Sequence, residues 1–408
     1  MMGPLANRTR IADRIVAIAK FNDAPELGGT TRLAYTSTCR DALELVAQWM
    51  ESCGMTSWMD AAGNLIGRLG DADSSGKPLA IGSHIDTVAN GGNYDGVLGV
   101  VAGLEVAAFI AENEISIDRP LEIIVFNEEE GALFGSRAVA GQVGEEDLLL
   151  EVRGVSKRDA LRAFGGDPAG LLAGYAERKN GFSAYLEVHI EQGPVLADAD
   201  VPLGAVEGIV GFLCADVAFR GETNHAGATP MESRHDALLG ACELALEVER
   251  LCNLPDYAAR GTVGVMNVHS GCLNAVPGHV SMTLDIRDLD ESVRDATCEA
   301  IVEAGEKSAK KRGLTVETNV YLKAPPALCD EEIIRLIEKH SAYLGYKSAR
   351  LASGAGHDAQ SMARICPMGM IFVRSTGGSH NPAEFAAPDD IAAGADVLIL
   401  TALDLLGS

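Results

Sequence analysis

The chain has 408 residues, of which 47% are hydrophobic and only 5% aromatic, and its acidic residues outnumber its basic ones 58 to 33. A single hydrophobic core stops growing at roughly 250 to 300 residues, so this length predicts two globular domains. The formal charge of −25 would repel phosphate backbones and anionic lipid, which argues against nucleic acid and membrane surfaces as partners.

Cysteine usage and the apolar runs bear on the cellular compartment. The nine cysteines are scattered and never in C-x-x-C spacing, which argues against a disulfide framework or a zinc ribbon. The N-terminus shows no apolar stretch of signal-peptide length, and the most apolar later run, residues 96–111, carries Glu105 and is too short to span a bilayer. We therefore expect a cytoplasmic protein without membrane insertion.

The first part of the chain alternates helical and strand-like segments. Residues 41–53 and 96–112 are predicted helices, whereas LAIGSH from Leu79 and LEIIVF from Leu121 are short continuous apolar runs typical of buried strands. Strands buried on both faces and alternating with helices indicate an α/β sheet with helices on both sides. In such sheets, functional sites gather at the carboxyl ends of the strands.

A different order of elements begins near residue 210. Residues 211–221, 262–269, 279–288 and 314–322 are predicted strands, and residues 234–251 and 291–311 are predicted helices. The order β-α-β-β-α-β is the ferredoxin-like pattern. We expect a catalytic domain formed by residues 1–211 and 326–408, interrupted by an inserted α+β domain at residues 212–325.

The first chemical signal is GSHIDTVANGGNYDG, which places His84 and Asp86 at the end of a strand and Asp95 in a glycine-rich loop. Residues two apart on a strand share a face, so Asp86 could accept a hydrogen bond from His84 and fix its tautomer. By itself, H-x-D is weak, because a single histidine or aspartate near a strand end is more often a capping or solvated residue. The surrounding glycines favour a loop that bends tightly around a bound group.

The second signal is the acidic triplet in NEEEG, directly after the predicted strand at Leu121. Three successive carboxylates repel one another unless a cation or water surrounds them. A solvated loop is one interpretation. In a metal site, one carboxylate binds the ion while its neighbour activates a water, which is the division of roles that we expect for Glu130 and Glu129.

Two further histidines complete the set of candidate ligands. His189 lies inside the apolar strand pattern YLEVHIEQGP, and His380 lies in the glycine-flanked loop TGGSHNPAEF. Either could be a satisfied structural histidine. Together with the acidic candidates they form a carboxylate and imidazole set that zinc, manganese or cobalt accepts.

Six motifs spread over residues 82–385 then carry a resemblance: GSHIDTVANGGNYDG, NEEEG, LEVHIEQGP, GETNHAGATPM, SGAGHDAQSMA and GSHNPAEF. In this order they resemble the hydantoinase/carbamoylase branch of the di-metal aminoacylase and carboxypeptidase-like amidohydrolases. That branch includes N-carbamoyl-L-amino acid hydrolases, β-ureidopropionases and allantoate amidohydrolases. HIEQGP is specific, because related exopeptidases outside this branch usually have an acidic ligand where His189 stands.

The resemblance implies an exopeptidase-like catalytic domain with a central mixed sheet, and an inserted domain that acts as a lid and forms a homodimer. It also implies two divalent ions per subunit, Zn²⁺ first, with Mn²⁺, Co²⁺ or Ni²⁺ as alternatives. Asp95 would bridge the ions, with His84 and His189 on one of them and Glu130 and His380 on the other. Glu129 would be the general base and Asp86 would orient His84.

Substrate contacts are also implied by the resemblance. Gln192, His225, Asn274 and Arg287 match positions that hold the carbonyl and carboxylate groups of the substrate, and the backbone at Gly356 would line the pocket. His225 could stabilise the developing oxyanion, reaching into the site of the partner subunit. An arginine fork suits a carboxylate because it can bind it in a bidentate manner.

Two departures from the family pattern lie near the expected position of the substrate tail. The segment after NEEEG is shortened to residues 132–134, and Arg374 stands where a proline is common, either as an anion contact or as a surface residue. The expected activity is hydrolysis of the ureido C–N bond of an N-carbamoyl-L-amino acid, with allantoate amidohydrolase or β-ureidopropionase as the alternative. A dipeptidase, an aminoacylase or an inactive binding module is disfavoured by HIEQGP and by the full ligand set.

Overall fold

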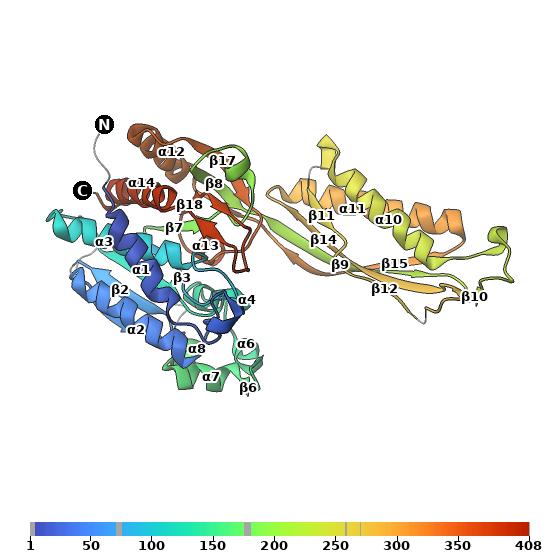
Figure 1. Ribbon diagram of the computed structural model, residues 1–408, viewed down its shortest axis with the longest axis horizontal. Helices are drawn as coiled ribbons and strands as arrows, with labels where there is room; N and C mark the ends of the chain where they lie inside the picture. The colour runs from blue at the N-terminus through green and yellow to red at the C-terminus, as the bar shows by residue number, and fades with distance from the viewer. Residues whose placement is uncertain (1–4, 71–75, 175–180, 258, 270, 408) are drawn as a thin grey trace. The chain divides into compact units, whose positions relative to one another are not determined.

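The computed structural model describes residues 5–70, 76–174, 181–257, 259–269 and 271–407 (Figure 1). Contacts within the chain divide it into two compact units, which we call unit 1 (Met1–Gly208 with Leu328–Ser408) and unit 2 (Ile209–Ala327). Unit 2 interrupts unit 1 in sequence, and its limits lie two or three residues outside the expected 212–325 segment.

Unit 1 contains a nine-stranded sheet. The strands follow one another across the sheet in the order β1 (Thr56–Met59), β2 (Leu65–Leu69), β4 (Leu121–Phe126), β3 (Leu79–His84), β7 (Ala184–Ile190), β18 (Met368–Val373), β8 (Leu203–Ile209) and β16 (Ala327–Leu328), with β17 (Ser348–Ser353) pairing with β8. Strands β4, β3, β7 and β18 are mutually parallel, whereas the β1–β2, β2–β4 and β8–β18 pairs are antiparallel. The expected mixed sheet is confirmed.

Helices cover both faces of this sheet, in two groups whose members contact one another. The first group consists of α1 (Arg8–Ala19), α3 (Val97–Glu112) and α14 (Pro388–Leu406), and the second of α5 (Phe134–Val139) and α13 (Asp358–Met362). The Val188 side chain of β7 lies beside Gly394 of α14, while the adjacent Glu187 accepts a hydrogen bond from the backbone N–H of Ala359 in α13. Successive strand residues point to opposite faces, so the two groups lie on opposite faces.

The other elements of unit 1 are short or peripheral. They are η1 (Pro25–Leu27), α2 (Ser37–Ser52), α4 (Glu129–Ala132), α6 (Glu145–Leu149), β5 (Glu151–Val152), β6 (Val155–Ser156), α7 (Lys157–Phe164), α8 (Pro168–Gly174), α9 (Val195–Asp198), α12 (Glu331–Leu344), β19 (Ser375–Thr376) and β20 (Phe385–Ala386). Every residue of the four parallel strands is buried, which explains their unbroken apolar runs.

Unit 2 is an antiparallel sheet covered by two helices. In chain order its elements are β9 (Gly211–Arg220), β10 (Asn224–His225), η3 (Met231–Ser233), α10 (Ala237–Cys252), η4 (Pro255–Tyr257), β11 (Arg260–Thr262), β12 (Met266–Val268), β13 (Ala275–Val276), β14 (His279–Asp288), α11 (Glu291–Arg312) and β15 (Thr315–Ala324). The main sheet has the order β15, β9, β14, then β11 with β12. This is the ferredoxin-like arrangement predicted from the sequence.

Alternation along the strands places the core of unit 2. The odd-numbered residues of β9 and the even-numbered residues from Val280 to Ile286 of β14 are buried. They pack with buried residues of α10 and α11, such as Leu244 and Ile301, in one apolar cluster. A strand with one buried face carries apolar residues at every second position, and these strands follow that rule.

Residues 262–269, expected as one strand, form two. Thr262 pairs with Asp285 and Met266 with Met282, so this side of the ladder holds one residue more than β14 between the two pairs. The backbone N–H of Val265 donates to the hydroxyl of Thr283 instead of continuing the regular ladder. One inserted residue of this kind is a β-bulge, which divides the strand.

Side-chain caps decide where the helices of unit 2 begin. The Asp236 carboxylate accepts hydrogen bonds from the backbone N–H groups of Leu238 and Leu239, so α10 begins at Ala237 and not at Arg234 as its apolar spacing predicts. An aspartate at this position satisfies N–H groups that the helix leaves free.

None of the helices in the described ranges is both long and apolar enough to cross a membrane. All nine cysteines are free, as their scattered spacing predicts.

An ion-pair cluster joins the two helices of unit 2. The Glu243 carboxylate of α10 lies 2.6 Å from a guanidinium nitrogen of Arg312 and 2.9 Å from the Lys311 ammonium, both on α11. The Arg312 guanidinium, together with Lys311 and Ser308, lowers the pKa of Glu243 to about 2. The folded state therefore holds this carboxyl group ionised at pH values where the unfolded chain protonates it.

We expect Glu243→Gln to lower the melting temperature at neutral pH, with a loss of about 1 kcal/mol or less because the cluster is partly exposed. The stabilisation is present above the ordinary glutamate pKa of 4.5 and declines as the pH falls toward about 2, so the two proteins should converge in acid. Thermal melts from about pH 7 to pH 3 measure this. Glu249→Gln, an exposed change on the same helix, is the control, and a pH-independent gap would contradict the assignment.

Candidate metal centre

The expected metal ligands lie at the carboxyl ends of the parallel strands of unit 1. His84 is the last residue of β3, His189 is the penultimate residue of β7, and Glu130 follows β4 in the short helix α4. Asp95 and His380 lie in the loops after β3 and β18. The carboxyl ends of parallel strands meet at one edge of the sheet, so the fold brings all five residues together.

The first group of potential ligands consists of His84, Asp95 and His189. One Asp95 oxygen, Oδ1, lies 3.5 Å from His84 Nε2 and 3.1 Å from His189 Nε2. All three side chains are almost completely buried. Two imidazoles and one carboxylate within this range can supply three protein ligands to a tetrahedral cation.

The second group shares Asp95 and adds Glu130 and His380. His380 Nε2 lies 3.2 Å from Glu130 Oε2 and 3.7 Å from the second Asp95 oxygen, Oδ2. In contrast to the first group, His380 is half-exposed and has a backbone φ of 59°. Asp95 therefore presents one carboxylate oxygen to each group, the arrangement that a bridging ligand of two ions requires.

Ring orientation shows which histidine nitrogens face this space. Nδ1 of His84 donates to the carbonyl of Asp86 (3.0 Å), and Nδ1 of His189 donates to the carbonyl of Ile190 (2.9 Å). In the neutral imidazoles that bind metal ions, each Nε2 is thereby the acceptor nitrogen. Nε2 of His84 is buried and has no hydrogen-bond partner among the described residues. An unpartnered buried acceptor is costly, and a bound cation would satisfy it.

The charges in the first group favour a protonated His84 and an ionised Asp95. Burial lowers the pKa of His84, but the carboxylates of Glu129 and Asp95 outweigh this and raise it well above the ordinary histidine value. Burial likewise raises the pKa of Asp95, but His189 and His84 hold it well below the usual range. Asp95 is therefore ionised and lies beside positive charge, which either the protonated imidazoles or a bound cation can supply.

Gly96 explains part of the glycine-rich loop. Its φ of 66° is in the left-handed region, and a Cβ at this position would lie 2.4 Å from Nε2 of His84. Any larger residue would both strain the backbone and displace the imidazole.

Asp86 acts differently from the expectation that its carboxylate holds His84. The carboxylate lies 3.7 Å from Nδ1 of His84, and the main-chain oxygen of Asp86 is the acceptor instead. The two carboxylate oxygens accept the backbone N–H groups of Glu129 and Glu130, each at 3.3 Å. An aspartate beside the first turn of a helix is well placed for this, so Asp86 positions the acidic segment.

Glu129 lies against the first group, with Oε2 3.6 Å from Nε2 of His84. Burial raises the pKa of Glu129 well above the usual glutamate range, an effect that His84 opposes and the Asp358 carboxylate reinforces. A carboxyl group that titrates nearer to neutral pH can both take up and return a proton. The shortened segment after it joins α4 directly to α5 through Leu133, which has a φ of 53°.

Gln192 lies at the metal centre, and Gly356 lies beside Leu133, which follows the acidic residues Glu129 and Glu130 in the chain. Nε2 of Gln192 donates to Oδ2 of Asp95 (2.8 Å), and its buried Oε1 has no partner among the described residues. Gln192 has a φ of 62°, and left-handed non-glycine residues cluster at functional sites. The backbone of Gly356 is open, with the Leu133 side chain as a neighbour.

Sequence reasoning missed Glu384 and Ser379, although both lie in the motif around His380. Oε1 of Glu384 accepts the backbone N–H groups of Tyr94 and Asp95, at 2.9 and 3.1 Å. The Ser379 hydroxyl lies 2.5 Å from Oδ2 of Asp95 and 2.8 Å from Glu384 Oε2. These contacts fix the position of Asp95. The acidic residue four positions after His380 was the available signal.

Behind the first group lies a second buried cluster of Glu187, His189 and His357. Both Glu187 oxygens are already occupied, by Ser83 and Tyr185 among others, and the His357 ring packs edge-on against His189 at 4.4 Å between centroids. We interpret this cluster as support for His189, because both oxygens of the Glu187 carboxylate already accept hydrogen bonds from protein groups.

The remaining predicted contacts belong to unit 2. Nδ1 of His225 accepts the backbone N–H groups of Gly227 and Ala228, which leaves its proton on Nε2, and the carbonyl of Asn274 accepts the N–H of Ala226. His225 and Asn274 therefore lie side by side.

Arg287 lies near the carboxyl end of strand β14, whereas His225 and Asn274 lie near its amino end. The Arg287 guanidinium binds both oxygens of Asp285, at 2.7 and 2.9 Å. Arg374, for which an anion contact and a surface role were both open, is engaged by Asp390 and Asp200 at 2.8 and 2.7 Å. Arg374 thus joins the end of β18 to α14 and has a structural role.

Comparisons with known proteins agree with this geometry. The sequence model of the peptidase family M20/M25/M40 matches residues 80–404. An N-carbamoyl-L-amino acid amidohydrolase of Geobacillus stearothermophilus is 40% identical over 404 residues, covering 97% of this chain and 98% of that protein. A ureidoglycolate hydrolase of Arabidopsis thaliana is 36% identical over 405 residues, covering 96% of this chain and 85% of the relative.

A solved hydantoinase/carbamoylase family amidase from Burkholderia ambifaria superimposes with a TM-score of 0.88 at 34% identity, covering 98% of this chain and 97% of that chain. The aminopeptidase PepT of Bacillus cereus, at 18% identity and a TM-score of 0.65, shares the fold alone. The chain belongs to the peptidase family M20/M25/M40 and, within it, to the hydantoinase/carbamoylase branch of amidases, which hydrolyse C–N bonds other than peptide bonds.

Proposed function

We propose that the protein hydrolyses N-carbamoyl-L-amino acids, releasing the amino acid, ammonia and carbon dioxide. The observation that carries this proposal is the two-group metal centre around Asp95 in a chain 40% identical, over nearly its whole length, to an N-carbamoyl-L-amino acid amidohydrolase. Ureidoglycolate hydrolases at 36 and 34% identity and allantoate deiminases at 33% make these ureido carboxylates the second candidates. All of these substrates join a ureido group to a carboxylate.

The donor set fits two divalent ions. His84, Asp95 and His189 would hold one, and Asp95, Glu130 and His380 the other. Imidazole and carboxylate ligands suit zinc first, and manganese, cobalt or nickel as alternatives. When bound, such ions polarise the substrate carbonyl and the attacking water.

The chain's own residues would carry the proton. Glu129, buried beside His84, would take a proton from the attacking water and return it to the leaving nitrogen. The Asp86 carboxylate would keep Glu129 in place by accepting a hydrogen bond from the main-chain N–H of Glu129. The amide of Gln192, held at Asp95, would orient the substrate beside the metal centre, with the backbone at Gly356 lining the pocket.

The expected contacts of unit 2 fit a shared site in a homodimer. His225 and Asn274 adjoin the beginning of strand β14 near His279, whereas Arg287 is eight residues further along it. At about 3.3 Å per residue, that separation is about 26 Å, too far for one small substrate to touch both ends. We therefore propose that Arg287 would bind the substrate carboxylate in one subunit's site and that His225 would enter the partner's site. The cytoplasmic location also stays a prediction.

Glu129→Gln should retain bound metal and lower kcat by about 10²- to 10⁴-fold, since it removes the proton carrier and keeps the shape of the side chain. Metal content by atomic emission and steady-state ammonia release measure the two effects separately. Glu51→Gln, an exposed change on α2, is the matched control. Full activity of Glu129→Gln would disprove the assignment of the base.

Removal of metal by a chelator should abolish ammonia release, and added Zn²⁺, Mn²⁺, Co²⁺ or Ni²⁺ should restore it. A panel of N-carbamoyl-L-amino acids, N-carbamoyl-β-alanine, allantoate, ureidoglycolate and a dipeptide then ranks substrates by kcat/KM. We expect an N-carbamoyl-L-amino acid to rank first and the dipeptide last. If allantoate or ureidoglycolate ranks first, the second candidates replace the first; no turnover with any metal would favour an inactive binding module.

A mixing experiment tests the shared site. His225→Ala and Glu129→Gln should each be nearly inactive alone, but a mixed dimer would contain one site with Glu129 from one subunit and His225 from the other. Random exchange of subunits should then restore about one quarter of the normal activity, since half of the dimers are mixed and each has one complete site. If the mixture stays inactive although mixed dimers form, His225 acts within its own subunit.

A further inference from the structure

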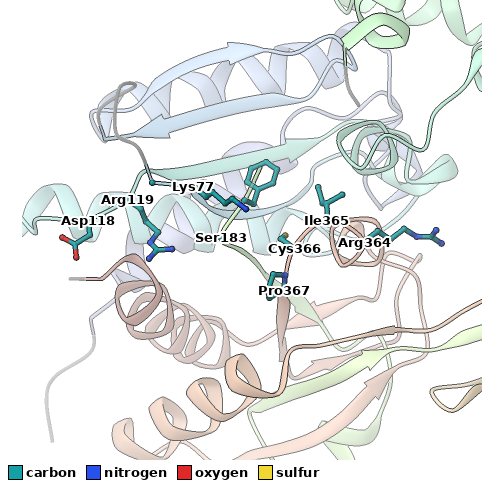
Figure 2. Close-up of a pocket in the computed structure, with 10 residues that line it drawn as sticks. Lys77, Asp118, Arg119, Ser183, Arg364, Ile365, Cys366 and Pro367 are labelled. Carbon is teal, nitrogen blue, oxygen red and sulfur yellow. The ribbon is translucent and has the colours of Figure 1, made fainter. Parts of the chain in front are cut away.

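A second pocket lies at the opposite edge of the same sheet (Figure 2). It is formed by the segments that lead into the parallel strands β3, β4, β7 and β18, and has a volume of about 680 Å³. The described residues that line it are Gly76, Lys77, Asp118, Arg119, Phe182, Ser183, Arg364, Ile365, Cys366 and Pro367. The six residues of β3 separate it from the metal centre by about 20 Å at 3.3 Å per residue.

Positive charge distinguishes this pocket within an acidic chain. The overall formal charge is −25, yet Lys77, Arg119 and Arg364 line the pocket together with a single acidic residue, Asp118, among the described lining residues. Lys77 and Arg119 lie on the same side as Ser183, whereas the guanidinium of Arg364 extends away from them (Figure 2). We therefore consider only Lys77 and Arg119 as cationic contacts for a ligand.

Among the described residues, neither of these two cations has a partner that would account for its position. Within the described ranges, the side chains of Lys77 and Arg119 take part in no ion pair and no hydrogen bond, and Nε of Arg119 is buried without an acceptor. A buried guanidinium nitrogen normally has an acceptor, because leaving it without one costs free energy.

The rest of the pocket is lined mainly by apolar groups. Phe182, Ile365 and Cys366 are buried and supply an apolar wall, and the Ser183 hydroxyl donates to the carbonyl of Pro78 at 3.1 Å. Ammonium and guanidinium groups together complement carboxylate and phosphate oxygens. We propose that this pocket binds a small, multiply charged oxyanion at a site separate from the metal centre.

Calorimetric titration of the metal-loaded enzyme with succinate and, separately, with inorganic phosphate tests the proposal. We expect the double variant Lys77→Ala/Arg119→Ala to bind the preferred anion at least tenfold more weakly. The control is Lys347→Ala/Arg220→Ala, which removes the same charge from exposed positions outside the pocket and without ion pairs in the described ranges. Comparing the two titrants shows whether a dicarboxylate or a phosphate is the preferred source of the oxyanion.

The metal centre can also attract anions, and the double variant separates the two sites. Binding that is equally strong in Lys77→Ala/Arg119→Ala belongs elsewhere and overturns the proposal, as does an unmodified enzyme that binds neither anion. Circular dichroism checks that the variant folds. Should it not, Lys77→Gln, an exposed and milder change, takes its place with the same expected direction.

Discussion

The Asp95 carboxylate faces imidazoles through both of its oxygens, with His189 at 3.1 Å and His84 at 3.5 Å from one and His380 at 3.7 Å from the other. Its burial would be costly without compensating charge, and further carboxylates at Glu129 and Glu130 increase the cost. The loop glycines, the caps and the short helix α4 all serve to hold these groups in one place. The electrostatic requirement for cations at this edge thus determines much of the local structure.

Sequence patterns predicted the residues whose signal is local. His84 and Glu130 follow unbroken apolar strands, and polar groups after such strands must meet at one sheet edge, so their proximity follows from periodicity alone. The support given to Asp95 by Glu384 depends on contacts across about 290 residues of chain, which no spacing rule conveys. The acceptor for His84 was misassigned because main-chain oxygens are present at every residue, and only geometry selects among them.

The β-bulge between β11 and β12 shows that local sequence patterns also predict the fold only in part. Residues 262–269 consist mainly of strand-forming residues, and the extra residue falls between Thr262 and Met266, where Gly264 is the only compositional mark of a bulge. The larger order of elements was predictable because it depends on burial, and burial leaves a periodic pattern. The division of a strand can depend on a single hydrogen bond, such as the one from Val265 to Thr283, and only the three-dimensional structure reveals it.

The two edges of the parallel strands carry opposite chemistry. Carboxylates and imidazoles gather at the carboxyl edge, whereas Lys77 and Arg119 lie at the amino edge without ion pairs among the described residues. The intervening strands are buried and rigid, so an anion at one edge could affect the other only through movement of whole strands or through its long-range field. Ions in the solvent screen such a field over about 10 Å, but the buried strands between the two edges screen it much less. An effect on catalysis could therefore come from the field itself or from a shift in how β3 and β7 present His84 and His189.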